Sequence, residues 1–541
     1  MMKSEVVAGV AGVAVGLMLR EIWLRTASKR EAKAMQALAN REAAVTASLS
    51  SGSIDGDASV QCTRGDNRTF GVSQSDTALV IIDMQADFLH PRGRLGQHYD
   101  AGRHAALAKT IAQVESLLGA AREAGLTIAH SRSHRYGAAV RRDLLEAQQP
   151  GAPEVVGGTP QHFGAVDVGY ELLPSLRALP GEIVVDKWTF GAFASTDLES
   201  QLRARGVRKI LLAGILTNVC VFATAVQACD RFFRVCLVED ACGAFRPDWH
   251  DKAVDLLSGP QCAPGHAGKA VGLYFGEVST VVHVKSALSA LLHTSKQGTP
   301  AHAQAARATA SAGAAPPRTI TIPSAAPSAF AFPRGKCALV MIDWQRDFLD
   351  IGGFGHALGN DVAPLQAALG PAAAVLAAAR KAGLLIVHTL EAHTPDLADC
   401  PAAKLSRCPA IGTTLDSTRG RVLVSGEPGN AIVDAVAPLP GELCVHKPGK
   451  GAFWNTKLED ELRGRGVSHL IVTGVTTEVC VQTTVREAND RGYDILVVSD
   501  ATESYFPHFK ASTLEMIVAQ GGIVGWTADS AAVLKALAGA A

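Results

Sequence analysis

The sequence predicts an α/β protein with two tandem domains, each a largely parallel β-sheet covered by helices on both faces. Three separated blocks recur in the same order at a constant offset of 260 positions, which identifies a tandem duplication. Each copy also alternates short apolar runs with longer amphipathic stretches, the pattern of repeated βα units. In such folds ligands bind beyond the carboxyl ends of the strands.

The duplicated blocks can be followed along the printed sequence. "ALVIIDMQADFL" at 78–89 returns as "ALVMIDWQRDFL" at 338–349, and "PGEIVVDKWTFGAF" at 180–193 returns as "PGELCVHKPGKGAF" at 440–453. "GILTNVCV" at 214–221 returns as "GVTTEVCV" at 474–481. Because all three pairs keep one register, insertions and deletions between the blocks cancel.

The spacing of apolar residues and the length of each apolar run predict the strands and helices of each copy. Runs that end at an Asp predict buried strands at 78–82 and 338–342. Glycines close the helices that follow, as is common at helix ends. The predicted helix and strand pairs are 105–124 with 126–130 and 198–205 with 209–213 in the first copy, and 372–382 with 384–388 and 458–465 with 469–473 in the second.

Composition suggests the domain boundaries. We predict a leader at 1–75, a first domain at 76–295, a linker at 296–335 and a second domain at 336–541. The leader is polar from residue 46 onward and is expected to be flexible there. The linker is rich in Ala, Pro, Ser and Thr, a composition expected to bury no core.

The leader contains one apolar stretch. Residues 6–19 carry no polar side chain and basic residues follow them, but the stretch is short of the roughly 17–25 residues that span a bilayer. Residues 6–24 are therefore read either as a membrane anchor that leaves the domains in the cytosol, or as a targeting leader or a helix packed on the protein. The expected location is therefore cytoplasmic, or at a membrane anchored by residues 6–24 with the domains facing the cytosol.

Charge and cysteine usage exclude several classes. Lys plus Arg and Asp plus Glu both total 51, so no cationic surplus is available for nucleic acid. Hydrophobic residues make up 48% and charged residues 19%, which excludes a mainly disordered chain. The 11 cysteines include no C-x-x-C pair, which argues against a structural zinc site or a disulfide framework.

A polar trio recurs where strands are predicted to end. A Cys at the start of a helix is expected to have a lowered pKa and an enriched thiolate. A neighbouring Asp can accept its proton, and a Lys can hold that Asp ionised. Duplicated scaffolding alone gives no reason to retain these polar residues, so we predict catalysis. The trios are Asp83, Lys187 and Cys220 in the first copy and Asp343, Lys447 and Cys480 in the second.

These motifs resemble those of the isochorismatase-like cysteine hydrolases, which include nicotinamidases, N-carbamoylsarcosine amidohydrolases, and biuret or ureidoacrylate amidohydrolases. The resemblance rests on "DMQADF", "KWTFGAF" and "GILTNVCV", and on "DWQRDF", "KPGKGAF" and "GVTTEVCV". It covers both copies and implies a doubly wound, Rossmann-like three-layer sandwich in each. It also implies cleavage of a C–N bond in a small amide or ureide through a Cys thioester.

The resemblance implies further roles near each cysteine. A non-proline cis peptide is expected at Ile215-Leu216 and at Val475-Thr476. The amides of Leu216 and Cys220, and of Thr476 and Cys480, are the expected oxyanion holes. The Asp is expected to take the thiol proton, protonate the leaving nitrogen and then activate water.

Candidate substrate contacts flank the trios. "HTLEAHTPDLADCP" at 388–401 resembles a bacterial subgroup pattern, so Glu391, His393 and Asp396 are expected near the entrance, with His393 equally a turn residue. The first copy differs here, with "HSRSHRYGAAVRRD" at 130–143, and is expected to hold another substrate. The other candidates are Gln85 and Gln345 as hydrogen-bond partners, and Phe88, Phe193, Phe348, Phe453 and Trp454 as apolar walls or core residues.

No cofactor or catalytic metal is expected, because neither copy has the Asp-x-His…His group of nicotinamidases. The expected partners are a small amide or ureide and water, with the two copies pairing within the chain or the chain forming a homo-oligomer. Two alternatives remain open: hydrolysis of an isochorismate-type vinyl ether, and a scaffold or pseudoenzyme with an inactive copy. Retention of both Cys220 and Cys480 favours amide chemistry.

Overall fold

The computed structural model describes residues 58–63, 69–93, 95–133, 169–259, 275–292, 319–401, 404–405 and 408–539. The apolar stretch at 6–24 and most of the predicted linker lie outside these ranges. Within them, no helix has the length and apolar character needed to cross a bilayer.

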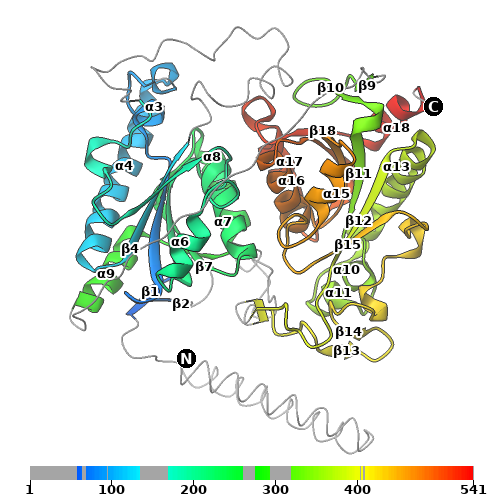
Figure 1. Ribbon diagram of the computed structural model, residues 1–541, viewed down its shortest axis with the longest axis horizontal. Helices are drawn as coiled ribbons and strands as arrows, with labels where there is room; N and C mark the ends of the chain where they lie inside the picture. Colours follow the sequence, from blue (N-terminus) through cyan, green and yellow to red (C-terminus); the bar gives the residue numbers. More distant parts are fainter. Residues whose placement is uncertain are drawn as a thin grey trace, which may run out of the picture. The chain divides into compact units, whose positions relative to one another are not determined.

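The first copy forms a six-stranded sheet in which every neighbouring pair of strands is parallel (Figure 1). The strand order, β5-β4-β3-β6-β7-β8, reverses direction next to β3, as in a doubly wound fold. The strands are β3 (Thr77–Ile82), β4 (Thr127–Ser133), β5 (Ile183–Lys187), β6 (Lys209–Ile215), β7 (Arg234–Gly243) and β8 (Glu277–Ser279).

The second copy repeats this sheet in the order β15-β12-β11-β16-β17-β18, again with only parallel pairs. The predicted fold class is therefore confirmed in both copies. The strands are β11 (Cys337–Ile342), β12 (Leu385–Glu391), β15 (Leu443–Lys447), β16 (His469–Val475), β17 (Asp494–Glu503) and β18 (Trp526–Ala528).

Helices cover both faces of the first sheet. One apolar core joins the sheet to α4 and α9, and another joins its opposite face to α6, α7 and α8 (Figure 1). The predicted helices at 105–124 and 198–205 correspond to α4 and α6. The helices are α3 (Ala86–Leu89), α4 (Ala101–Glu123), α6 (Leu198–Ala204), α7 (Phe222–Asp230), α8 (Pro247–Ser258) and α9 (Val281–Leu292).

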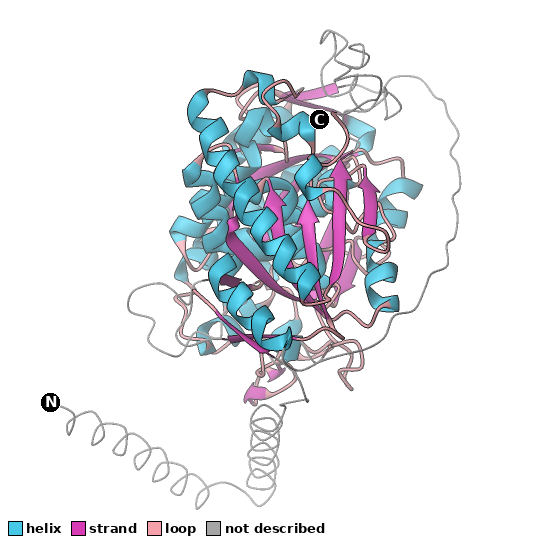
Figure 2. Cartoon of the chain, turned by 90° about the vertical axis from the view of Figure 1, so that its left-hand side faces the viewer, coloured by secondary structure: helices cyan, strands magenta, loops and turns pink. Residues whose placement is uncertain are grey.

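The second sheet is covered in the same way, with α13 and α18 on one face and α15, α16 and α17 on the other. Figure 2, in which the first copy faces the viewer, shows helices flanking the strands of that copy. The core under α6 and α7 continues into the core under α15 and α16, and α7 contacts α16. The helices are α10 (Arg346–Leu349), α11 (Phe354–Ala357), α12 (Ala363–Ala367), α13 (Leu369–Ala382), α15 (Leu458–Gly464), α16 (Gln482–Asp490), α17 (Pro507–Gly522) and α18 (Ser530–Ala538).

Short antiparallel hairpins precede both copies, in segments that the composition did not predict to pack. They are β1 (Ala58–Gln61) with β2 (Thr69–Val72), and β9 (Thr319–Ile322) with β10 (Phe330–Pro333). Phe330 and Phe332 are buried in the second copy's core. The predicted linker thus includes a packed hairpin, because alternating apolar residues within a Pro- and Ala-rich stretch face one side of a strand pair. A third hairpin joins β13 (Thr414–Asp416) to β14 (Gly420–Arg421).

Strand register brings the predicted chemistry to one sheet edge. Ile82, the residue before Asp83, pairs with Ser131 and with Gly214, and Ser133 pairs with Lys187. The second copy has the same register. Because parallel strands end at the same edge, each Asp, each Lys and the turn that carries each Cys converge there.

Candidate active site

A buried Asp–Lys ion pair lies at the carboxyl edge of each sheet. Asp83 follows β3 and Lys187 ends β5, and Lys187 Nζ lies 2.7 Å from Asp83 Oδ2. In the second copy, Lys447 Nζ lies 2.8 Å from Asp343 Oδ2. All four side chains are almost fully excluded from solvent. The sequence predicted these pairs and the structure brings them together.

The lysines remain charged in this environment. Burial disfavours the ammonium group of Lys187, but Asp83 and Cys220 outweigh it, so the pKa of Lys187 is raised above its usual value. Burial likewise disfavours the ammonium group of Lys447, but Asp343 and Cys480 outweigh it and raise the pKa of Lys447. Each Lys is therefore a fixed cation beside the cysteine.

A hydroxyl group holds the other oxygen of each Asp. Ser131 Oγ donates to Asp83 Oδ1 at 2.7 Å, and Thr389 Oγ1 donates to Asp343 Oδ1 at 2.6 Å. Neither Ser131 nor Thr389 was predicted from the sequence. Their signal is the shared position directly after a histidine, in "HSRSH" and "HTLEAH". The Lys and the hydroxyl together fix the orientation of the carboxylate.

Each cysteine lies on a single π-helical turn between a strand and a helix. The turns are Thr217–Val221, which leads into α7, and Thr477–Val481, which leads into α16. Cis peptides precede them at Ile215-Leu216 and Val475-Thr476, so this prediction is confirmed.

A glycine allows the strand before each turn to approach its neighbour. Gly474 has φ +142°, and a Cβ there would lie 2.4 Å from the carbonyl oxygen of Ile342. Gly214 has φ +118°, and a Cβ there would lie 2.3 Å from that of Ile82. No larger side chain fits at either position, because the neighbouring contact is backbone.

The expected enrichment of thiolate is wrong for the ligand-free site. Burial raises the pKa of Cys220 to about 12, with Lys187 opposing it. Burial also raises the pKa of Cys480 well above its usual value, against the effect of Lys447. Desolvation therefore outweighs the helix terminus and the lysine. Each cysteine is therefore a neutral thiol at rest, and it could act as a nucleophile only with the help of a base.

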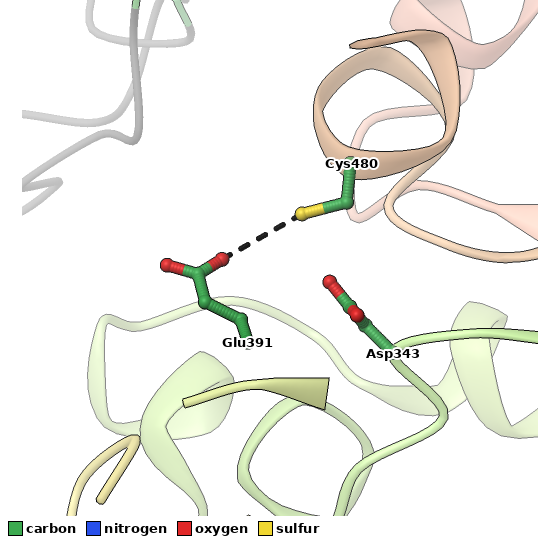
Figure 3. Close-up of side chains that lie close together, drawn as sticks. All are labelled: Asp343, Glu391 and Cys480. Carbon is green, nitrogen blue, oxygen red and sulfur yellow. Dashed lines mark hydrogen bonds between the residues drawn. The ribbon is translucent and has the colours of Figure 1, made fainter. Parts of the chain in front are cut away.

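In the second copy a buried glutamate adjoins the thiol (Figure 3). Cys480 Sγ donates to Glu391 Oε2 at 3.6 Å, and one potential ligand atom each of Asp343, Glu391 and Cys480 lie within 4.8 Å of one another. The other glutamate oxygen, Oε1, lies 2.7 Å from both Lys404 Nζ and Lys450 Nζ. Burial opposes ionisation of Glu391, but these two lysines outweigh it and hold the pKa of the carboxyl well below its usual range.

Lys404 and Lys450 were missed by the sequence analysis. Lys450 lies inside the duplicated block "KPGKGAF", where the first copy has Phe190, so a difference between the copies was its signal. Lys404 lies at a helical position outside the blocks and also donates to the carbonyl of Pro448 at 2.6 Å. Nothing in the sequence indicated that Lys404 reaches the site.

The first copy has no counterpart of Glu391 at the same register position. Gln85 Oε1 accepts from the amide of Ser133 at 2.7 Å, just as Gln345 Oε1 accepts from the amide of Glu391 at 2.8 Å. Ser133 therefore stands where the second copy has Glu391. With Phe190 in place of Lys450, the described part of the first site lacks this charge cluster.

The side chains of Gln85 and Gln345 form hydrogen bonds with backbone groups and are not left free for a substrate. Gln345 Nε2 donates to the carbonyls of Glu391 and Asn430, each at 3.1 Å. Gln85 Nε2 donates to the carbonyl of Tyr170 at 2.7 Å. Both ends of each amide are engaged, so the expected substrate hydrogen bonds are replaced by a role in fixing the strand ends.

Most of the predicted aromatic walls are packed in cores. Phe193 and Phe453 lie in the core shared by the copies, with ring centroids 5.6 Å from Phe233 and 5.8 Å from Tyr493 respectively. The other candidates also have packing partners: Phe348 packs 6.2 Å from Phe354, Phe88 borders the core under α4, and Trp454 lies 4.9 Å from Phe232 of the first copy.

The predicted entrance residues of the second copy differ from one another. His393 is buried beside Asp399, and burial together with Lys404 lowers its pKa to about 4, so it is neutral. Asp396 is exposed and accepts from Thr394 Oγ1 at 2.7 Å. Glu391 is thus the only one of the three that contacts Cys480.

A metal ion does not suit the cluster in Figure 3. Asp343, Glu391 and Cys480 offer three ligand atoms, but Lys447 lies 2.8 Å from Asp343 and two further lysines lie 2.7 Å from Glu391. A divalent cation would have to displace or deprotonate these ammonium groups.

The two sheets and their matching Asp, Lys and Cys sets define a two-domain α/β protein whose copies share one site design. The sequence model of the Isochorismatase domain matches residues 77–265 and again residues 337–529. The chain therefore belongs to the isochorismatase family, with one such domain in each copy.

Individual relatives match about one copy. Ureidoacrylate amidohydrolase RutB of Cronobacter sakazakii is 32% identical over 231 residues, covering 40% of this chain and 95% of the relative. RutB of Methylorubrum extorquens is 32% identical over 224 residues, covering 40% and 89%. Among solved structures, a cysteine hydrolase from Pseudomonas syringae pv. phaseolicola aligns with a TM-score of 0.34 at 24% identity, covering 39% of this chain and 96% of its own.

Proposed function

We propose that each copy is a cysteine hydrolase that cleaves a C–N bond of a small amide or ureide. The observation that carries the proposal is the buried Asp–Lys pair beside a turn-borne Cys, present twice in one chain. Similarity to two ureidoacrylate amidohydrolases supports amide or ureide chemistry.

The first step is transfer of the thiol proton of Cys480 to Asp343. Because burial raises the pKa of Cys480, the thiolate forms only as a partner of Lys447 and at the moment of attack. Its electron pair forms a C–S bond to the carbonyl carbon, and the carbonyl π pair moves to oxygen. The amides of Thr476 and Cys480 stabilise that oxyanion.

Collapse of the tetrahedral species breaks the C–N bond. The proton held by Asp343 passes to the leaving nitrogen, which departs as ammonia or an amine and leaves a thioester on Cys480. Asp343 then takes a proton from water, hydroxide attacks the thioester, and the thiolate leaves and regains the proton. Asp83, Lys187 and Cys220 perform the same steps in the first copy.

The second site is proposed to prefer an anionic ureide. Three lysines, Lys404, Lys447 and Lys450, face two carboxylates there, which leaves one positive charge unmatched while Cys480 is a thiol. A substrate carboxylate would offset this charge in a buried site, where electrostatic interactions are strong. The described part of the first site has Phe190 and Ser133 at the positions of Lys450 and Glu391, so we propose a different substrate for the first site.

Ammonia release tests the proposal. Wild type, Cys220→Ala and Cys480→Ala would be assayed on matched neutral and anionic amides and ureides, with Cys444→Ala as a control because Cys444 is an exposed thiol. We expect each active-site substitution to abolish turnover of one substrate set and Cys444→Ala to leave both unchanged. Unaltered rates in both Cys220→Ala and Cys480→Ala would refute the assignment.

A further inference from the structure

Each copy places an aspartate on the active-site loop of the other copy. The loop after Lys447 directs two backbone amides at Asp230, the last residue of α7 in the first copy. Lys450 N donates to Asp230 Oδ1 and Gly451 N donates to Asp230 Oδ2, each at 2.8 Å. Asp230 is 2% exposed. A single buried carboxylate thus accepts two adjacent amides from the other copy.

The contact is reciprocal. The loop after Lys187 directs its amides at Asp490, the last residue of α16 in the second copy. Phe190 N donates to Asp490 Oδ1 at 2.7 Å, and Gly191 N donates to Asp490 Oδ2 at 3.1 Å. Asp230 and Asp490 also differ by 260 positions, so duplication preserved both sides of the exchange.

We propose that Asp230 is a positioning residue for the second active site and Asp490 for the first, so that neither site is complete without the other copy. This inference rests on the proposed function, since it assigns a role to residues that act through Lys447 and Lys187. It predicts that substitutions in one copy impair the chemistry of the other.

The loop peptides connect each aspartate to the lysine. Lys447 Nζ donates to the carbonyls of Gly449 and Lys450, at 3.2 and 3.0 Å. The amide protons of those same two peptide groups, on Lys450 and Gly451, are the ones that Asp230 accepts. Each peptide is therefore polarised between an anion on one side and the catalytic ammonium on the other, an arrangement in which hydrogen bonds strengthen one another.

The first copy contains the same connection. Lys187 Nζ donates to the carbonyl of Thr189 at 3.0 Å, and the amide of that peptide, Phe190 N, donates to Asp490. The ion pair of Lys187 with Asp83 thus depends on a loop whose other side is held by the second copy. Loss of the aspartate is expected to loosen the loop and weaken the hold of the lysine on Asp83 and Cys220.

Glycine lets each loop lie close to a helix of its own copy, α16 for Gly451 and α7 for Gly191. A Cβ on Gly451 would lie 2.1 Å from Glu487 Oε2, and a Cβ on Gly191 would lie 2.2 Å from the side-chain amide of Gln227. Gln227 also donates to Asp490 Oδ2 at 2.7 Å, which orients that carboxylate. This close packing leaves the loops little room to shift in the intact chain.

A second, one-sided contact reaches the first site. Arg486 of α16 is 2% exposed, donates through Nη2 to the carbonyl of Asn218 at 3.0 Å, and lies 4.6 Å from the ring centroid of Phe222. Asn218 belongs to the turn that carries Cys220. The position equivalent to Arg486 in the first copy is Val226, so the second site receives no matching cation.

Site-resolved alkylation tests the proposal without knowledge of the substrate. Iodoacetamide would be added to the full chain, and the rates at Cys220 and Cys480 would be followed by mass spectrometry over a range of pH. Asp230→Asn is expected to slow Cys480 about tenfold, because one amide would face an NH2 group and the lysine would be less firmly held. Asp490→Asn is expected to slow Cys220 by a similar factor.

The crossed pattern is what a purely structural role would not produce. Asp230→Asn should also move the pH profile of Cys480 alkylation upward, since a weaker lysine stabilises the thiolate less, and the ratio of the two cysteine rates should change in opposite directions in the two variants. Asp230→Glu and Asp490→Glu, which retain the charge, should show the same crossed pattern with smaller changes, and they replace the Asn variants if those do not fold. Asp460→Asn, an exposed site on α15, is the control.

Equal slowing of both cysteines, slowing within the same copy, or no change would overturn the proposal. Failure of the proposed function is distinguished by ammonia release: it would appear as unchanged turnover in Cys220→Ala and Cys480→Ala, whatever the alkylation pattern. In a Cys220→Ala background, Asp230→Asn should reduce kcat of the second site about tenfold with a smaller change in KM, because the lysine acts on the chemical step.

Discussion

The first and second candidate sites share an Asp, a Lys and a Cys in the same arrangement, but they differ in the residues around this trio. The distance from the Lys Nζ to the Asp Oδ2 is nearly the same in both, 2.7 Å for Lys187 and Asp83 and 2.8 Å for Lys447 and Asp343. At the next strand end, however, Ser133 stands in place of the buried Glu391. Duplication therefore retained the groups to which we assign the bond-making and bond-breaking steps and changed a neighbouring group.

The largest expected effect concerns Lys187 and Lys447, which we expect to contribute equally to the activity and stability of their own copies. Lys447→Met and Lys187→Met should each lower kcat/KM in their own copy by about 10²–10³-fold, since each removes the fixed charge beside the thiolate. Each also leaves a buried carboxylate unpaired, which should cost about 3–5 kcal/mol in the free energy of unfolding. Activity in Cys220→Ala and Cys480→Ala backgrounds, with urea unfolding, measures both effects.

A result in which only one lysine matters would break the symmetry of the two sites. Lys285→Met is a suitable control, because Lys285 is exposed on α9 and bonds Ser116 at 2.9 Å. It should change neither activity nor stability appreciably.

Glu391 should matter in the second copy alone. Glu391→Gln removes the counter-charge of Lys404 and Lys450, so we expect kcat/KM of the second site to fall about 10–100-fold and stability to fall by a few kcal/mol. Ser133→Ala at the equivalent position should change the first site less than about threefold, since the bonds of Ser133 to Gln85 use only its backbone. Comparable losses of kcat/KM in Glu391→Gln and Ser133→Ala would show that the residue at this position does not distinguish the two sites.

These residues also show where prediction from sequence succeeds and stops. The strands, both trios and the cis peptides could be predicted, because strand-end polar residues repeated in fixed register and the register of parallel strands then brings them together. Lys404 could not, because it reaches Glu391 from 13 residues downstream, along a path of the chain that depends on tertiary folding. The thiol pKa was expected in the wrong direction, because burial is a property of packing that a helix-start motif does not reveal.

Pairing of the copies within the chain was one of the expected arrangements, but the two aspartates that make the contact escaped prediction for a related reason. Asp230 and Asp490 end helices at positions where an acidic residue opposes the helix dipole, which looks like a solvated terminus in sequence. Their partners are backbone amides some 220 and 300 positions away, and amides carry no side-chain signature. Only the recurrence at the same offset could have singled them out.

One difference between the copies near their contact is expected to make the stability of the chain depend on pH. Glu487 occupies the position of Gln227, and burial, with Asp230 adding to it, raises the pKa of Glu487 to about 7. In the folded chain Glu487 therefore binds a proton that the unfolded chain releases near pH 4.5, so its contribution to stability is present below that pH and is lost as pH rises toward about 7.

Glu487→Gln should remove this loss and make the second copy resemble the first. We expect the variant to gain roughly 1–3 kcal/mol relative to wild type between pH 5 and pH 8, with the gain growing as pH rises. Comparing variant and wild type at each pH isolates Glu487 from His393, whose lowered pKa acts in the opposite direction. A difference that is flat across this range in urea unfolding would contradict the assignment.

The smallest expected effect concerns the entrance of the second site, where Asp396 and Glu391 were both predicted from one motif. Asp396 is exposed, and its carboxylate accepts from Thr394 Oγ1 at 2.7 Å and from the amide of Ala398 at 3.1 Å, so it shapes its own loop and does not reach Cys480. An exposed carboxylate is screened by water and salt. Asp396→Asn should therefore leave kcat/KM of the second site within about twofold of wild type at physiological salt. A tenfold loss would mean that the substrate extends outward beyond Glu391 to the exposed loop, and the buried cluster would then be only part of what distinguishes the second site from the first.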